Sequence, residues 1–175
     1  ALIPYITAGH PVGDSTATVL HALADSGADL IELGLPFSDP LADGPTIQSS
    51  SFSSLQNGTK VENVLAELSL FRAEREIPVV LFTYLNPVLR YGLEDFLLDA
   101  TESGASGLLL TDLPVGADYG VERAVAESPL DFIRLVAPTT REERVPEIAE
   151  SGSGFLYYIS RAGVTGVRSQ LRESL

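Results

Sequence analysis

The sequence contains no cysteine and only two histidines, His10 and His21. The absence of cysteine excludes disulfide scaffolds, thiolate zinc sites and thiol nucleophiles. The two histidines are too few for a multi-histidine metal site, and we expect both to be structural. No metal site is therefore expected.

Positive charge is also scarce, since Lys60 is the only lysine and acidic residues outnumber basic ones by 24 to 11. The resulting net charge of −13 argues against binding to nucleic acid or to an anionic membrane surface. No apolar run approaches the ~20 residues of a membrane span. The sequence shows no secretory signal pattern either. These absences predict a cytoplasmic protein.

Short apolar runs alternate with amphipathic stretches along the whole chain. The predicted strands are residues 2–7, 30–35, 78–83, 107–111, 132–137 and 155–159. The predicted helices are residues 15–25, 61–72, 93–101, 117–126 and 140–150, the last with Thr140 as its N-cap and Glu143 completing a capping box. This alternation predicts a parallel sheet with right-handed crossovers.

Two architectures satisfy such a pattern, an open doubly wound sheet and a (β/α)₈ barrel. Polar residues and glycines follow every predicted strand, which favours the barrel, because a barrel shares its site among all βα loops. A complete barrel needs about 250 residues, whereas this chain has 175. The prediction is therefore a single partial TIM-barrel domain over residues 1–175, with strands one to six. The chain begins inside a strand and stops at the start of a helix, so we expect a fragment of a longer protein.

Glu32 is the most informative residue, because it interrupts the apolar run LIELGL at residues 30–35. Alternation places it on the same face as Leu30 and Gly34. A carboxylate on a strand buried on both faces is costly unless it is paired or protonated. The pattern favours a catalytic carboxylate with a raised pKa. The alternative is a structural ion pair or a place at the bottom of the barrel.

The segment PFSDPLADGP at residues 36–45 follows at once and is stiff and polar. A folded-back loop brings Asp43 and Glu32 over the strand ends together, and two carboxylates in different environments suit acid/base work. Asp39 and Asp43 also fit a simpler role as turn formers. The glycine-rich loop at residues 160–166 suits a mobile lid or an anion-binding loop, or is an ordinary βα loop.

The run ELGLPFSDPLADGPTIQ at residues 32–48 closely resembles the signature of the tryptophan synthase alpha subunit family. Further matches follow in the family's order: PYITAG at 4–9, YLNP at 84–87, DLP at 112–114 and YYISRAGVTG at 157–166. The resemblance covers essentially the whole chain. It implies a (β/α)₈ barrel that cleaves indole-3-glycerol phosphate to indole and glyceraldehyde 3-phosphate without a cofactor of its own. It also implies an alpha₂beta₂ assembly with a beta subunit that carries pyridoxal phosphate.

By the same resemblance, Glu32 is the general acid/base and Asp43 is the carboxylate that holds the indole N–H. The positions that match the family's substrate contacts are Tyr5, Phe82, Leu109, Tyr157, Thr165 and Gly166. Asp39 and Asn86 match positions at or near the contact with the beta subunit.

The chain also departs from the family pattern. Ser53 stands where the family usually has an arginine, and the family's N-terminal helix and its seventh and eighth strands are not in the sequence. Because those last loops form most of the family's phosphate site, a second hypothesis is a module that only docks on a beta subunit. A third is another phosphate-binding barrel, such as a sugar-phosphate epimerase or isomerase. Such sites commonly use His, Lys or a metal ion, and this chain has only two histidines and one lysine.

Overall fold

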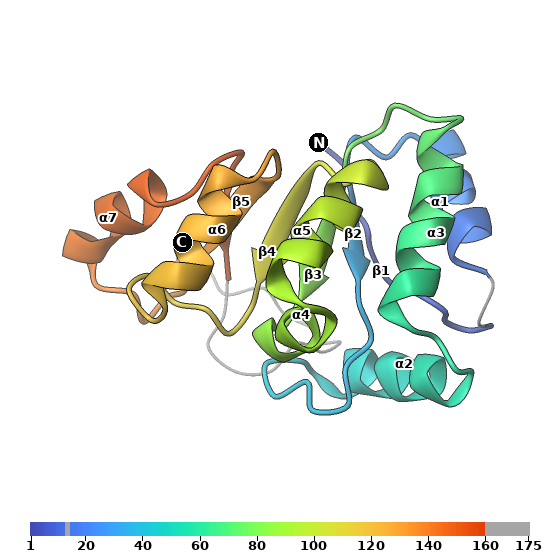
Figure 1. Ribbon diagram of the computed structural model, residues 1–175, viewed down its shortest axis with the longest axis horizontal. Coiled ribbons are helices and arrows are strands. Elements are labelled where there is room, and N and C mark those ends of the chain that lie inside the picture. Colours follow the sequence, from blue (N-terminus) through green and yellow to red (C-terminus); the bar gives the residue numbers. More distant parts are fainter. Residues whose placement is uncertain (13–14, 160–175) are drawn as a thin grey trace, which may run out of the picture.

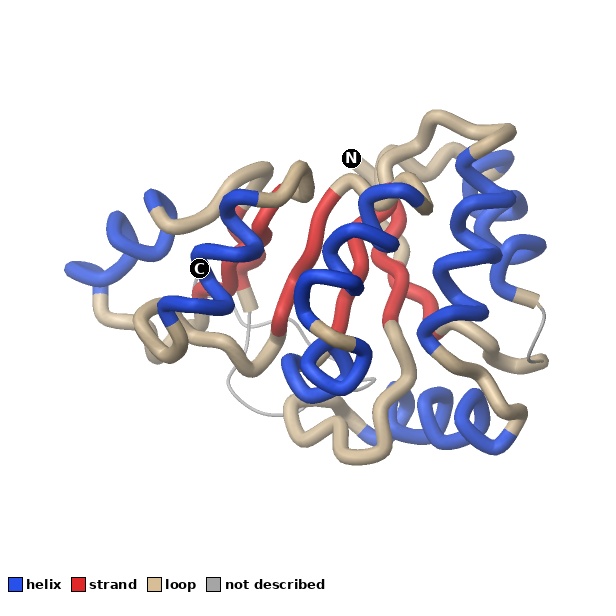
Figure 2. Tube along the Cα trace, viewed as in Figure 1, coloured by secondary structure: helices blue, strands red, loops and turns tan. Residues whose placement is uncertain are grey.

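The computed structural model describes residues 1–12 and 15–159, in which strands and helices alternate (Figure 1; Figure 2). The strands are β1 (Tyr5–Thr7), β2 (Ile31–Gly34), β3 (Val79–Thr83), β4 (Gly107–Leu110), β5 (Asp131–Val136) and β6 (Leu156–Tyr158). The helices are α1 (Thr16–Asp25), α2 (Pro45–Gln56), α3 (Val61–Arg72), α4 (Leu85–Tyr91), α5 (Leu93–Glu102), α6 (Tyr119–Glu127) and α7 (Val145–Glu150). A 3₁₀ turn, η1 (Glu142–Arg144), immediately precedes α7.

All neighbouring strands in the sheet are parallel, and their order follows the chain from β1 to β6. An open doubly wound sheet reverses its strand order and carries helices on both faces. Here the order never reverses, so the strands form part of a barrel wall. The incomplete (β/α)₈ barrel is therefore confirmed, and the doubly wound alternative is wrong.

The two faces of the sheet have different cores. The outer face packs on the helices through Ile31, Leu33, Val79, Leu81, Leu108, Leu110 and Phe132, against helical residues that include Leu20, Val64, Phe71, Phe96 and Val121. The inner face has its own, smaller cluster of Val80, Leu109 and Ile133, with Leu30, Phe82, Leu135, Phe155 and Tyr157 around them. Successive side chains of one strand thus enter different cores, as expected for near-continuous apolar strands.

Two helices were not predicted as separate elements. α2 includes the serine-rich tract at residues 49–54, and α4 begins two residues after β3, among the polar residues that follow that strand. Pro45 and Pro87 both lie in the first turn of their helices. Backbone N–H groups in the first turn have no acceptor within the helix, so the missing N–H of proline costs no helical hydrogen bond there. In these positions proline is compatible with a helix rather than a sign of a loop.

The predicted helix over residues 140–150 is wrong at its start. α7 begins only at Val145, and the Thr140 hydroxyl accepts from the Ala137 N–H instead of capping a helix. Pro146 has no N–H to donate to the carbonyl of Glu142, so a regular α-helix cannot extend back to Thr140. The residues before it form the 3₁₀ turn. No helix in the part of the chain that the structure describes is long and apolar enough to cross a membrane.

Arg134 is a charged side chain buried on the outer face of β5, only 4% exposed. Its Nη2 donates to Glu122 Oε2 at 2.6 Å, and its other nitrogens donate to the carbonyls of Leu113 and Ser151. The guanidinium carbon also lies 3.8 Å from the centre of the Phe132 ring. Every part of this buried cation therefore has a partner, which offsets much of its desolvation cost.

We predict that Glu122→Gln in the complete protein lowers the free energy of unfolding by about 3 kcal/mol, because it leaves the Arg134 charge buried and unpaired. Chemical denaturation measures this. Glu127→Gln is a matched control on the same helix, since its partner Arg123 is solvent-exposed and such pairs contribute little. Equal stability losses in the two variants would contradict the prediction.

Candidate active site

Glu32 lies in the middle of β2, on the inner face of the sheet. Its register partners are Tyr5 on β1 and Val80 on β3, and the whole residue is only 6% exposed. Leu30, two positions earlier, belongs to the inner cluster, whereas Ile31 and Leu33 belong to the outer core. The shared face of Leu30 and Glu32 is thus as predicted from alternation.

The Glu32 carboxylate has no ion-pair or hydrogen-bond partner among residues 1–12 and 15–159. Burial alone raises its pKa from 4.5 to about 7. The structural ion pair that the sequence left open is not found within those residues. Arg134, on the outer face, shows how this fold compensates a charge that serves structure. Glu32 has no such compensation from the described residues and, with a pKa of about 7, can hold or release a proton near neutral pH.

A row of aromatic rings lies on the same face as Glu32. The ring centroids of Tyr5 and Phe82 are 5.5 Å apart, and those of Phe82 and Tyr157 are 5.8 Å apart, both in edge-to-face geometry. Burial raises the pKa of the Tyr5 hydroxyl to about 12, with smaller contributions from the Asp43 and Glu32 charges. Burial, and then the Glu32 charge, also raise the pKa of Tyr157. Both carboxylates therefore lie near the aromatic row.

Gly34 makes the close approach of Tyr5 possible. A Cβ atom at this position would lie 2.0 Å from the Tyr5 hydroxyl oxygen, so any side chain here would displace the ring. Leu109, fully buried on β4, packs in the inner cluster with Phe82 and Tyr157. The predicted substrate contacts Tyr5, Phe82, Leu109 and Tyr157 thus share one apolar face.

Asp43 is held by Tyr84, which was not predicted to be a site residue. The Tyr84 hydroxyl donates to Asp43 Oδ2 at 3.0 Å and accepts from the Ala42 N–H at 3.0 Å. Burial raises the pKa of Asp43, and the Tyr84 hydrogen bond lowers it. Phe37 packs against the Tyr84 ring, with centroids 5.2 Å apart. The motif YLNP contains Tyr84, but only the folded loop shows its partner.

The remaining predicted positions do not join this cluster. Asp39 is exposed in the segment between β2 and α2, and Asn86 is exposed in the first turn of α4. Thr165 and Gly166, with the rest of the glycine-rich loop, lie outside the described residues. His21 packs against Phe71 and lies 3.8 Å from Glu74, a structural setting as expected.

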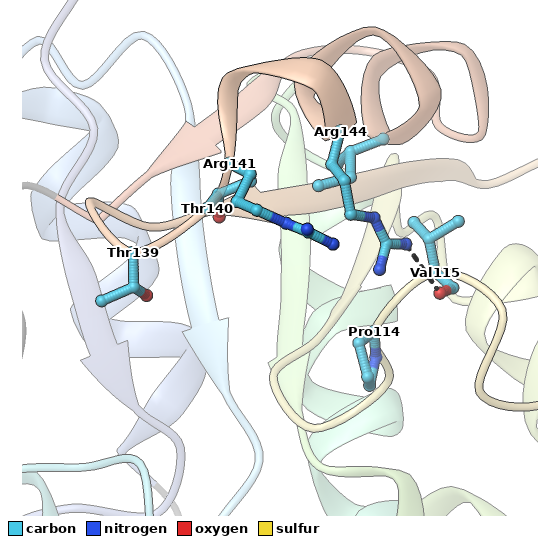
Figure 3. Close-up of a pocket in the computed structure, with 7 residues that line it drawn as sticks. Pro114, Val115, Thr139, Thr140, Arg141 and Arg144 are labelled. Atoms are coloured by element: carbon cyan, nitrogen blue, oxygen red, sulfur yellow. Dashed lines mark hydrogen bonds between the residues drawn. The ribbon is translucent and has the colours of Figure 1, made fainter.

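A hollow of about 290 Å³ lies elsewhere, between the segment after β4 and the segment after β5. Its lining residues are Pro114, Val115, Thr139, Thr140, Arg141, Arg144 and Ile148. Figure 3 shows the side chains of Arg141 and Arg144 extending into the same space, with Arg144 donating to the Val115 carbonyl at 3.3 Å. None of the predicted site residues lines it. Within the described residues, no cluster of three or more His, Asp or Glu could hold a metal ion.

The arrangement on the inner face provides two carboxylates with different support. Glu32 is buried with no counter-charge from the part of the chain that the structure describes, whereas Asp43 accepts a hydrogen bond that favours its ionised form. Such a pair can combine proton transfer by one group with charge stabilisation by the other. The aromatic row beside them offers an apolar surface for a flat ligand.

We predict that Glu32→Gln stabilises the complete protein in a pH-dependent way. The folded-state pKa of about 7 lies above the unfolded value, so stability falls as the pH rises from about 4.5 through 7. Glutamine avoids this loss. The variant should match the original at about pH 4 and gain about 3 kcal/mol at about pH 8, measured by denaturation. A difference that does not grow with pH would contradict the raised pKa, and exposed Glu94→Gln serves as control.

Tyr84→Phe should raise the pKa of Asp43, because the lost hydrogen bond favoured the ionised carboxylate. Carbon-13 NMR titration of the carboxyl group measures this pKa directly. Tyr91→Phe is the matched control, since it removes a tyrosine hydrogen bond to Asp99 instead. An unchanged Asp43 titration in Tyr84→Phe would show that the hydroxyl does not support this carboxylate.

Comparison with known proteins identifies the relatives of this chain. The family model described as tryptophan synthase alpha chain matches residues 1–175. The tryptophan synthase alpha chain of Trichormus variabilis is 48% identical over 98% of this chain and 64% of that protein. The chain thus spans slightly less than two thirds of the length of this relative.

Solved structures agree with the sequence match. Tryptophan synthase of Mycobacterium tuberculosis superposes with a TM-score of 0.89 at 40% identity, covering 98% of this chain and 66% of that chain. The tryptophan synthase complex of Pyrococcus furiosus has a TM-score of 0.85 at 43% identity, covering 90% of this chain and 65% of that chain. Sequence and fold match over nearly the full chain, and the protein therefore belongs to the tryptophan synthase alpha chain family.

Proposed function

We propose that the complete protein cleaves indole-3-glycerol phosphate to indole and glyceraldehyde 3-phosphate, the alpha reaction of tryptophan biosynthesis. The observation that carries this proposal is Glu32, a buried carboxylate without a partner among the described residues, beside an aromatic row and near a second carboxylate. Family membership supports the same reaction. A module that only docks would have no use for such a costly group.

The aromatic row supplies the binding surface for the indole ring. Tyr5, Phe82 and Tyr157 contact one another edge to face, and Leu109 is buried beside them. This surface lies on the Glu32 side of the sheet, so a ring bound against it meets the carboxylate at its edge. Holding the substrate in one orientation lowers the entropic part of the barrier.

The bond between indole C3 and the side-chain carbon C3′ breaks after C3 is protonated. Protonated Glu32 donates this proton, and ionised Asp43 accepts a hydrogen bond from the indole N–H and stabilises the positive charge that develops there. Glu32, now ionised, takes the proton of the C3′ hydroxyl as the aldehyde forms. The electrons of the broken bond return to the indole ring, and Glu32 ends the cycle protonated.

A pKa of about 7 suits Glu32 to both roles, since both protonation states are populated near neutral pH. The reaction needs no metal or organic cofactor on this chain. The proposed lid contacts Thr165 and Gly166 belong to a loop outside the described residues.

The proposed partner is a tryptophan synthase beta subunit, which would carry pyridoxal phosphate and join indole to serine in an alpha₂beta₂ assembly. Exposed Asp39 and Asn86 are the proposed contact positions. The solved Pyrococcus furiosus relative is a tryptophan synthase complex, which supports this assembly. We also propose a cytoplasmic location, in keeping with a biosynthetic role, which cell fractionation tests.

We predict that Glu32→Gln in the complete protein lowers the rate of indole release from indole-3-glycerol phosphate by at least ~10²-fold, because it removes the proton donor and acceptor. Indole is measured by its colour reaction or by chromatography. Glu94→Gln, an exposed position on α5, should keep the full rate. Near-normal turnover in Glu32→Gln, with the fold intact, would refute the assignment.

A further inference from the structure

α2 is attached to the rest of the molecule in an unusual way. Its buried residues are Ser51 and Ser54, and no α2 side chain belongs to either hydrophobic cluster. Phe52, its largest apolar side chain, is exposed. Figure 1 shows α2 at the ends of the strands, apart from the row of outer helices. Its half-buried apolar residues, Ile47 and Leu55, also lie outside both clusters, so within the described residues apolar packing contributes little to the placement of this helix.

Polar contacts with the end of β1 and the residues that follow it hold it instead. The hydroxyls of Ser50 and Thr7, the last residue of β1, are hydrogen-bonded at 2.7 Å. The Ser54 hydroxyl, fully buried, donates to the Ala8 carbonyl at 2.6 Å. Asn57, directly after α2, donates through Nδ2 to the carbonyls of Gly9 at 3.3 Å and Pro11 at 3.1 Å. A buried carbonyl such as that of Ala8 is costly to leave without a donor. The three hydrogen bonds from Ser54 and Asn57 are termed the α2 anchor below.

The segment that receives the α2 anchor is itself rigidly placed. The Gly9 N–H donates to Thr16 Oγ1 on α1 at 2.9 Å, and the Ala8 N–H donates to the Gly34 carbonyl at the end of β2. Gly9 has φ +70°, and a Cβ atom there would lie 2.0 Å from Thr59 Oγ1. The C-terminal end of α2 and the residues after β1 are therefore held close to each other. Both are also held to β2, the strand that carries Glu32, through the Ala8 hydrogen bond.

The opposite end of α2 leads directly to Asp43. Only Gly44 separates this carboxylate from Pro45, the first residue of the helix, and Gln48 Nε2 donates back to the Asp43 carbonyl at 2.9 Å. Tyr84 holds the Asp43 side chain from the β3 end. The position of Asp43 thus depends on Tyr84 from one direction and on the placement of α2 from the other.

We propose that Ser54 and Asn57 are positioning residues that set Asp43 relative to Glu32 by anchoring α2 to the backbone after β1. The role for catalysis rests on the proposed function above. The anchor acts through the helix, so Ser54 and Asn57 need not touch the substrate. No α2 side chain joins the hydrophobic clusters. Loss of the anchor therefore shifts the residues around Asp43, at positions 40–44, while the core keeps its packing.

The test compares Ser54→Ala and Asn57→Asp with the control Ser49→Ala in the complete protein. Asn57→Asp keeps the side-chain shape but removes both donated bonds, and Ser49 is an exposed serine on the same helix. We expect kcat to fall about tenfold or more in the two anchor variants, since small misplacement of a reacting group is costly. KM should change far less in both variants. Ser54→Ala should also lower the melting temperature, because it leaves the Ala8 carbonyl without its donor. Asn57 is exposed, so Asn57→Asp should nearly keep the melting temperature, and a merely structural role would not lower kcat in that variant.

Hydrogen exchange supplies a readout that does not need activity. The Ala42 amide donates to the Tyr84 hydroxyl, and the amides of Asp43 and Gln48 donate to the carbonyls of Pro40 and Gly44. All three amides should exchange faster in both anchor variants, whereas β2 and β3 amides should not. Exchange and kcat equal to those of Ser49→Ala would overturn the proposal. If the unaltered protein releases no indole, the proposed reaction fails, and the exchange result alone then supports or overturns the anchor.

Discussion

The constraint on which this structure depends is the burial of the Glu32 carboxylate on the inner face of the sheet. Burial raises its pKa to about 7, and no partner among the described residues offsets that cost. The surrounding packing must therefore hold a destabilising group in place. The outer core does so, because it fixes β2 through Ile31 and Leu33, whose side chains point away from Glu32. The strand is thus stabilised on one face and chemically useful on the other.

Glu32 and Arg134, two charged residues buried in the described strands, show opposite solutions to the same physical problem. Arg134 is surrounded by a carboxylate, two backbone carbonyls and an aromatic ring, so that its charge is compensated and its pairing serves the packing of α6 and α7. Glu32 keeps its protonation free to change. A buried charge whose hydrogen-bond and ion-pair partners are all present stabilises the packing around it. A buried carboxylate without such partners has a shifted pKa and can transfer a proton.

Asp43 needs a different kind of support, because it lies on a segment with little apolar burial of its own. Tyr84 fixes its side chain, and α2 holds the backbone that follows it. Both supports are polar: Tyr84 lies 41 positions further along the chain, and α2 is held through Ser54 and Asn57 at the end opposite to Asp43. The site therefore combines a rigid strand position with a segment held by a few hydrogen bonds, which ties its geometry to residues such as Ser54 that lie outside the reacting centre.

The sequence alone determined the strand order, the face of Glu32 and the family, since alternation and motif order are local properties of the chain. It misplaced the start of the last described helix, where Pro146 prevents a regular turn, and it missed α4, where Pro87 is accommodated in the first turn. Only the tertiary structure decided that Glu32 has no partner among the described residues, that Tyr84 holds Asp43 and that serines anchor α2. These depend on contacts between residues some 40 or more positions apart, whose geometry no local pattern encodes.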